Sequence, residues 1–215
     1  MAVKREYSSR LRESQARETR RAIVAAASRL LVRDGYGGTT IDSIAEAAGV
    51  SRKTVFTSTG GKADLMKLAL DWAIVGDDDP VSLAKRPDVR EIARLTDPDA
   101  IIAGYVAVIV DINKRTAMLS EALAVAAGVD AQARDLREQA VAQRLTGARA
   151  FVKHLAKQDG LAVGLNVATA ADIVWVHSDP ALYRWLVLER RWSPRRFHTW
   201  LQRTLTLQLR GDQGR

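Results

Sequence analysis

The sequence predicts an all-α fold, with a small basic unit at the N-terminus and a larger helical body after it. Apolar residues recur at helical spacing from end to end, and no stretch alternates as a half-buried strand would. A cap-forming side chain followed by proline occurs at Asp97-Pro98, Asp179-Pro180 and Ser193-Pro194. This pair marks a helix start, because the first helical amide has no intrahelical partner and proline loses nothing there. The first 62 residues carry most of the excess positive charge, with Lys and Arg at 12 against 6 Asp and Glu.

The composition limits the kinds of protein that the chain can be. The 215 residues are 47% hydrophobic, which is enough for a substantial core, and there is no cysteine for a disulfide or a thiolate metal site. The N-terminus is charged throughout, and the longest apolar run, Ala100 to Val110, is far shorter than a membrane span of roughly 20 residues. We therefore expect a cytoplasmic protein with no membrane partner, and the local basic excess indicates nucleic acid.

Eleven helices are expected along the chain. They span residues 17–33, 40–48, 51–58, 62–75, 88–95, 98–114, 116–127, 130–158, 167–178, 180–190 and 194–209. The first has apolar residues at helical spacing and stops at Asp34-Gly35, and the next two are separated only by Gly49-Val50. The fourth is periodic and ends at the acidic stretch 76–80, and three of the later helices begin at the cap-proline pairs.

The two short helices satisfy the steric needs of a helix-turn-helix. Ala45 is small where the helices would cross, and Gly49 stands where the turn requires a positive φ. Ser51 can cap the second helix, which has the right size for the major groove of DNA. The apolar residues that would fix the crossing angle are Ile44, Val50 and Val55.

The span from about Arg17 to Trp72 resembles the DNA-binding domain of TetR-type (TetR/AcrR) transcriptional regulators. The shared elements are Thr39-Thr40, Ile44-Ala45, Ala48-Gly49-Val50-Ser51, Phe56 and Lys62. The sequence departs from the pattern at Lys53, where the family commonly has glycine, at Phe56, where it has tyrosine, and at Ser58-Thr59, where it has an aromatic-containing pair. We therefore expect a shifted set of DNA contacts.

The resemblance implies three regions and a set of DNA-contacting residues. Residues 1–16 would form a basic arm that is disordered at its start and either lies on DNA or is merely solvated. Residues 17–62 would form the DNA-binding domain, and residues 63–215 a helical domain for ligand binding and dimerisation. Arg52 is the best candidate for reading a base, because a guanidinium can bond guanine O6 and N7 together. The expected DNA-binding residues are Thr39, Thr40, Ser51, Arg52, Lys53, Thr54, Phe56, Thr57 and Lys62.

The helical body is expected to carry a dimer interface and a small-molecule pocket. The interface candidates, from the last two helices, are Leu182, Trp185, Leu186, Phe197, Trp200, Leu201 and Leu205. The pocket candidates are Trp72, Tyr105, Ile109, Asn113, Met118, Phe151 and Trp175. The alternative for each of these residues is ordinary core, since aromatic and Met residues in helical bodies are more often core than interface or pocket.

The sequence favours a regulator over an enzyme. His154, His177 and His198 lack metal-ligand spacing, Asp77 to Asp79 are interpreted as a solvated helix end, and no cofactor motif is present. We expect a sequence-specific repressor that binds a palindromic operator on double-stranded DNA as a homodimer and is released by an unidentified small-molecule effector. The alternatives are a non-specific architectural DNA binder and a helical ligand-binding protein or enzyme without DNA function.

Overall fold

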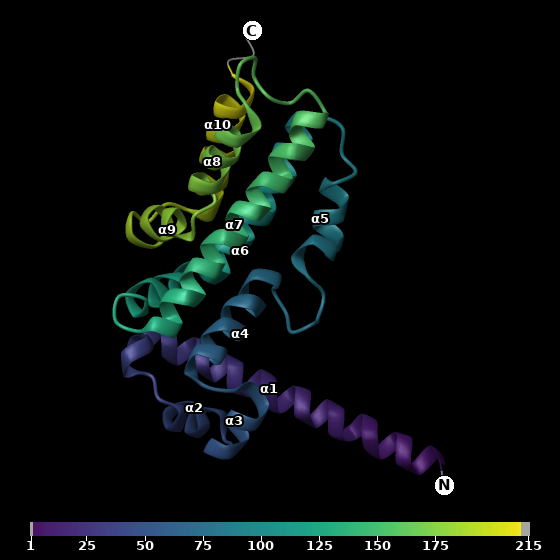
Figure 1. The fold of residues 1–215 in the computed structure, drawn as a ribbon, viewed down its shortest axis with the longest axis vertical. Coiled ribbons are helices and arrows are strands. Elements are labelled where there is room, and N and C mark those ends of the chain that lie inside the picture. Colours follow the sequence, from purple (N-terminus) through teal and green to yellow (C-terminus); the bar gives the residue numbers. More distant parts are fainter. Residues whose placement is uncertain (1, 212–215) are drawn as a thin grey trace. The chain divides into compact units, whose positions relative to one another are not determined.

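The structure is a computed structural model that describes residues 2–211, with side chains from residue 12 onward. Its helices are α1 (Ala2–Gly38), α2 (Ile41–Ala48), α3 (Arg52–Thr59), α4 (Lys62–Val75), η1 (Leu83–Lys85), α5 (Pro87–Ile92), α6 (Pro98–Ala126), α7 (Ala131–Lys157), α8 (Val167–His177), α9 (Pro180–Tyr183), η2 (Arg184–Glu189) and α10 (Pro194–Arg210). Residues 2–211 contain no strand, so the all-α prediction is confirmed (Figure 1). No helix in this range is long and apolar enough to cross a membrane.

The chain forms two compact units. Unit 1 runs to Trp72 and also includes Glu121–Arg137, and unit 2 comprises Ala73–Ser120 and the residues from Glu138 onward. Unit 1 thus includes residues 63–72 of α4, and the domain boundary expected at residue 62 stays a prediction. Leu65 and Met66 of α4 are fully buried.

Unit 1 is built around α1, on which α2 and α3 pack (Figure 1). Ile23, Ala26 and Leu31 of α1 are fully buried, as the helical spacing of the apolar residues predicted. Ile44 and Val55 contribute the buried side chains of α2 and α3. The core of unit 1 therefore includes one apolar face from each of these helices.

α1 differs from its predicted length at both ends. Its backbone is already helical at Ala2, so the predicted arm continues the helix, while the side chains of Lys4, Arg5 and Arg10 lie outside the described part of the chain. At the other end Gly35 leaves the helical region, with φ 71° and ψ 173°. The predicted stop at Asp34-Gly35 is therefore a kink, after which one further turn extends to Gly38.

Unit 2 has its own apolar core, formed by α6, α7, α8 and α10. Phe197, Leu201 and Leu205 of α10 are at most 1% exposed, and Tyr183 meets Phe197 edge-to-face with ring centroids 5.2 Å apart. Tyr105 of α6 stacks on Phe151 of α7, with ring centroids 3.9 Å apart. The first of these contacts joins α9 to α10 and the second joins α6 to α7, and residues of all four helices belong to the same core cluster.

Three predicted helices of the body, over 98–114, 116–127 and 180–190, are arranged differently in the structure. The expected break near residue 115 is absent, and α6 is continuous. Thr116 fits within this helix because its buried hydroxyl donates a hydrogen bond to the Ile112 carbonyl, 2.9 Å away. The helix expected over 180–190 is one α-helical turn, α9, followed by the π-helix η2.

Candidate nucleic-acid interface

Side-chain caps set the geometry of α2, the turn and α3. The Thr40 hydroxyl accepts a hydrogen bond from the Ser43 amide at 3.0 Å, and the Ser43 hydroxyl accepts one from the Thr40 amide at 3.1 Å, forming a capping box. Gly49 ends α2 with φ 66°, a left-handed conformation that favours glycine. The Ser51 hydroxyl then starts α3 by accepting from the Thr54 amide at 3.0 Å.

α3 has one buried face and one exposed face. Val55 and Thr59 point into unit 1, and the Thr59 hydroxyl donates to the Val55 carbonyl at 2.9 Å. The exposed side chains are Arg52, Lys53, Phe56 and Thr57. Because these four positions are separated by one and four residues, they lie on one side of the helix. The structure thus brings two cations, an aromatic ring and a hydroxyl together on a single helical surface.

Arg52 has defined partners on this surface. Its Nη1 donates to Oδ2 of Asp42 on α2 at 2.7 Å, and its guanidinium lies 5.6 Å from the centre of the Phe56 ring. Both members of the ion pair are exposed, with 60% of the Arg52 side chain and 66% of the Asp42 side chain accessible. Sequence reasoning did not identify Asp42, because a partner ten residues away on another helix leaves no spacing signal.

Two of the expected DNA contacts have structural partners inside unit 1. Thr39 is 1% exposed, and its hydroxyl donates to the Gly35 carbonyl at 2.8 Å, so this side chain holds the last turn of α1. The Lys62 ammonium donates to the Tyr36 carbonyl at 2.7 Å and lies 4.1 Å from the centre of the Tyr36 ring. The Thr39 bond thus closes the turn that follows the kink at Gly35, and the Lys62 bond connects the end of α1 to α4.

Arg20 also has a structural contact within unit 1. Its Nε and Nη2 both donate to the Ser58 carbonyl, at 3.0 and 2.7 Å. This carbonyl belongs to the last turn of α3, whose carbonyls lack intrahelical donors. Arg20 therefore anchors the end of α3 to α1.

Of the seven residues expected at a dimer interface, three are buried and four leave part of their surface accessible. Phe197, Leu201 and Leu205 are buried in the core of their own chain, so their role is to support the last helix from inside. Trp185 is 47% exposed. The half-buried members, which pack against the core while leaving part of their surface accessible, are Leu182, Leu186 and Trp200.

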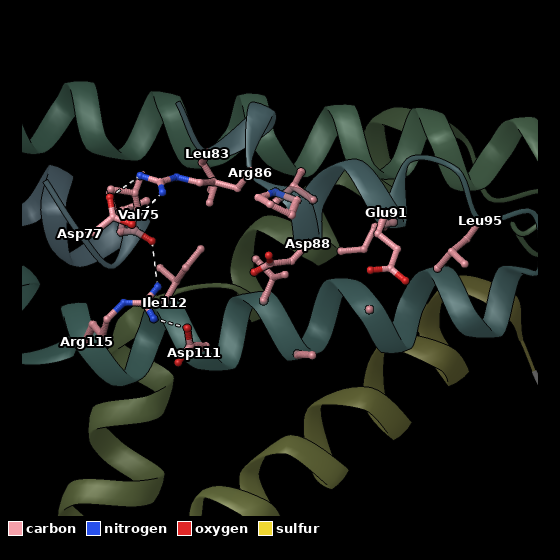
Figure 2. Close-up of a pocket in the computed structure, with 17 residues that line it drawn as sticks. Val75, Asp77, Leu83, Arg86, Asp88, Glu91, Leu95, Asp111, Ile112 and Arg115 are labelled. Atoms are coloured by element: carbon pink, nitrogen blue, oxygen red, sulfur yellow. Dashed lines mark hydrogen bonds and ion pairs between the residues drawn. The ribbon is translucent and has the colours of Figure 1, made fainter. Parts of the chain in front are cut away.

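Unit 2 contains a cavity of about 620 Å³ between the end of α4, the η1–α5 segment and α6 (Figure 2). Its apolar lining comprises Ile74, Val75, Leu83, Pro87, Val89, Ile92, Leu95, Gly104, Ala107, Val108 and Ile112. Its charged lining comprises Asp77, Arg86, Asp88, Glu91, Asp111 and Arg115. A mostly apolar hollow with a few polar groups is the usual form of a small-molecule site.

Charged pairs occupy one end of this cavity. Arg86 donates to both carboxylate oxygens of Asp77, at 2.7 and 2.6 Å, and these hydrogen bonds lower the pKa of Asp77 below its ordinary value. Asp77 is therefore an ion-pair partner and not only the solvated helix end expected from the sequence. Arg115 pairs with Asp111 and donates to the Ala73 and Ile74 carbonyls at 2.6 and 2.9 Å.

None of the seven residues expected in a ligand pocket lines this cavity. Tyr105 and Phe151 stack on each other, and Met118 is 40% exposed. Asn113 is 1% exposed, and its side-chain nitrogen has no hydrogen-bond partner among the described residues; the same is true of the Trp175 indole nitrogen. Ile109 packs against the core of unit 2, and Trp72 is half-buried in unit 1.

Known proteins match the N-terminal part of the chain by sequence. The profile of "Bacterial regulatory proteins, tetR family" matches residues 23–69. The DNA-binding transcriptional repressor TetR of Mycobacteroides abscessus is 44% identical over 55 residues, which cover 25% of this chain and 29% of that protein. The HTH-type transcriptional regulator TtgR of Pseudomonas putida is 39% identical over 59 residues, covering 27% of this chain and 28% of the relative. The matches thus span less than a third of these curated relatives.

Solved structures match most of the chain by fold. A putative TetR-family regulator from Syntrophomonas wolfei has a TM-score of 0.68 at 18% identity, over 88% of this chain and 94% of that one. The regulator FadR from Bacillus subtilis, solved in complex with stearoyl-CoA, has a TM-score of 0.63 at 16% identity, over 86% and 96%. The fold of α1 to α10 is thus that of these regulators, and residues 23–69, which include the helix-turn-helix, match the tetR family of bacterial regulatory proteins.

Proposed function

We propose that this protein binds a specific duplex DNA sequence through α3 and represses transcription from it. The observation that carries the proposal is the exposed face of α3, where Arg52, Lys53, Phe56 and Thr57 lie together on a capped helix-turn-helix. A short helix presenting cations and hydroxyls suits the major groove, where base edges can be distinguished. The curated relatives matched by this segment are named as transcriptional regulators, which supports the same conclusion.

The side chains of α3 have different roles in this proposal. Arg52 reads a base, because four of its five N–H groups remain for DNA after one is given to Asp42. Lys53 binds a base or a phosphate, and Thr57 a phosphate or a thymine methyl group. Thr40 and Ser51, at exposed helix starts, are placed to offer phosphates hydrogen-bonding groups near positive helix ends.

The proposed operator is palindromic because one short helix reads few base pairs. A homodimer places two copies of α3 on half-sites related by a two-fold axis. Trp185, with nearly half of its surface accessible, and the half-buried Leu182 and Leu186 provide apolar surface for the subunit contact. The fully buried residues of α10 support that surface from within each subunit.

We propose that the cavity of unit 2 holds the effector. A ligand that binds one conformation of the dimer more tightly than another increases the population of that conformation. The protein then releases DNA if the favoured conformation cannot place both α3 helices in successive major grooves. Stearoyl-CoA, which the Bacillus subtilis neighbour holds, is a suitable first probe because the cavity lining is mainly apolar. Weaker operator binding in its presence supports effector release; unchanged binding rejects this probe as the effector.

Selection of bound fragments from genomic DNA tests the proposed function. Purified protein is incubated with duplex fragments at about 150 mM salt, where non-specific phosphate attraction is weakened. The expected result is an enriched inverted repeat. The Arg52→Ala/Lys53→Ala variant should enrich no motif while remaining dimeric. The matched control, Arg149→Ala/Lys153→Ala, removes two exposed charges from α7 and should select the wild-type motif. Retention of the motif by the α3 variant would contradict the recognition-helix assignment.

A further inference from the structure

Asp42 lies beside Arg52, the side chain proposed to read a base. A surface that only binds phosphates does not account for a carboxylate at this position. Asp42 occupies the first turn of α2, is exposed, and accepts from Arg52 at 2.7 Å. We propose that Asp42 is a specificity-determining residue, which orients the Arg52 guanidinium for reading a base. This inference rests on the proposed function, since it concerns how α3 selects its DNA sequence.

Arg52 is constrained from two helices. Asp42 on α2 fixes Nη1, and Phe56, one turn further along α3, lies with its ring centre 5.6 Å from the guanidinium carbon. A free arginine loses considerable rotamer freedom when it binds. Holding the guanidinium before DNA arrives reduces that loss, and a fixed planar group discriminates better between base edges than a mobile one.

The charge of Asp42 acts on correct and incorrect DNA differently. A carboxylate on a surface that meets phosphates repels every duplex, whatever its sequence. Its favourable effect, in contrast, is realised only where Arg52 finds a base that accepts its remaining N–H groups. Asp42 should therefore weaken non-specific binding and preserve specific binding, and both effects raise the specificity ratio.

The Asp42→Asn variant tests this inference, since it removes the charge and keeps the shape. Glu46→Gln is the matched control: Glu46 stands one turn along the same helix, is exposed, and its side chain pairs with no described residue. Arg52→Ala marks the base positions that Arg52 reads. The wild type and the three variants select from one random duplex library at about 150 mM salt, and each Kd is then measured for the selected and a scrambled duplex.

The expected result separates the carboxylate's contact from its charge. Asp42→Asn should lose preference at the positions that Arg52→Ala loses, and its ratio of scrambled to selected Kd should fall by about 5-fold or more, while the Kd for the scrambled duplex falls or stays the same. Glu46→Gln should keep the full preference. Circular dichroism melting confirms that each variant is folded.

Other outcomes overturn the inference in distinguishable ways. If Asp42→Asn binds the selected duplex more tightly with unchanged preference, the ion pair is a restraint that DNA must break. If Asp42→Asn and Glu46→Gln behave alike, the pair contributes nothing beyond charge, as many exposed ion pairs do. If the wild type itself enriches no motif, the proposed function fails together with this inference, whereas the first two outcomes leave the proposed function intact.

Discussion

Lys62→Met gives a direct measure of whether Lys62 is a structural side chain. The substitution removes the hydrogen bond from Lys62 Nζ to the Tyr36 carbonyl and the contact of the ammonium with the Tyr36 ring, and retains a flexible apolar chain. A hydrogen bond from a charged donor contributes about 1.5–3 kcal/mol, and a cation–π contact about 0.5–1 kcal/mol where water has access. Because Lys62 is half-buried, we expect the lower part of this range, a loss of about 2 kcal/mol from the free energy of unfolding.

Urea denaturation followed by circular dichroism measures that loss, and Lys67→Met is the control. Lys67 is an exposed lysine on the same helix, paired with Asp71 at 2.5 Å, so its replacement should change the free energy of unfolding by at most about 0.5 kcal/mol. The reasoning is refuted if Lys62→Met is as stable as the wild type. If that stable variant also binds DNA more weakly, Lys62 acts on phosphate, as the family resemblance implied.

Three further predictions concern the turn, the subunit contact and the response to pH. Gly49→Ala should lower the free energy of unfolding by about 1 kcal/mol, because φ 66° disfavours a side chain although no atom lies within 4 Å of the added methyl group; Gly49→Asn, measured in the same urea titration, should lose less. Trp185→Ser should shift the proposed dimer toward monomer in analytical ultracentrifugation without lowering the melting temperature of the isolated subunit. In contrast, Leu201→Ala should cost about 2–5 kcal/mol in urea denaturation, because that side chain is fully buried. Equal effects of the two substitutions on assembly and stability would count against the proposed interface. Burial raises the pKa of Tyr105 above its ordinary value of about 10, so its contribution to stability is complete below that pH and is lost as the pH rises further; urea midpoints between pH 8 and 11 should fall less steeply for Tyr105→Phe, and identical slopes would exclude this tyrosine as the cause.

The helical architecture and the helix-turn-helix could be predicted from the amino-acid sequence, since both depend on local interactions. Ser51 caps an amide three residues away, and Gly49 adopts its own left-handed dihedral angles. The caps and the turn can therefore be predicted from residues that are adjacent in the sequence. Helical periodicity likewise identified Ile23 and Leu31 as buried. The exposed face of α3 follows from the same local geometry.

The contacts between side chains on different helices could not be predicted and follow from how the helices pack. Arg52 and Asp42 are ten residues apart, and Lys62 and Tyr36 are twenty-six apart, so no helical spacing relates them. None of the seven residues predicted from helical periodicity to form a ligand pocket lines the cavity. Periodicity shows that a side chain faces inward, but it does not show whether a neighbouring helix packs against that side chain or leaves a cavity. For the same reason Phe197 was expected at a subunit interface and lies in the core: its apolar side chain favours either environment equally, and only the packing of α8 and α10 selects between them.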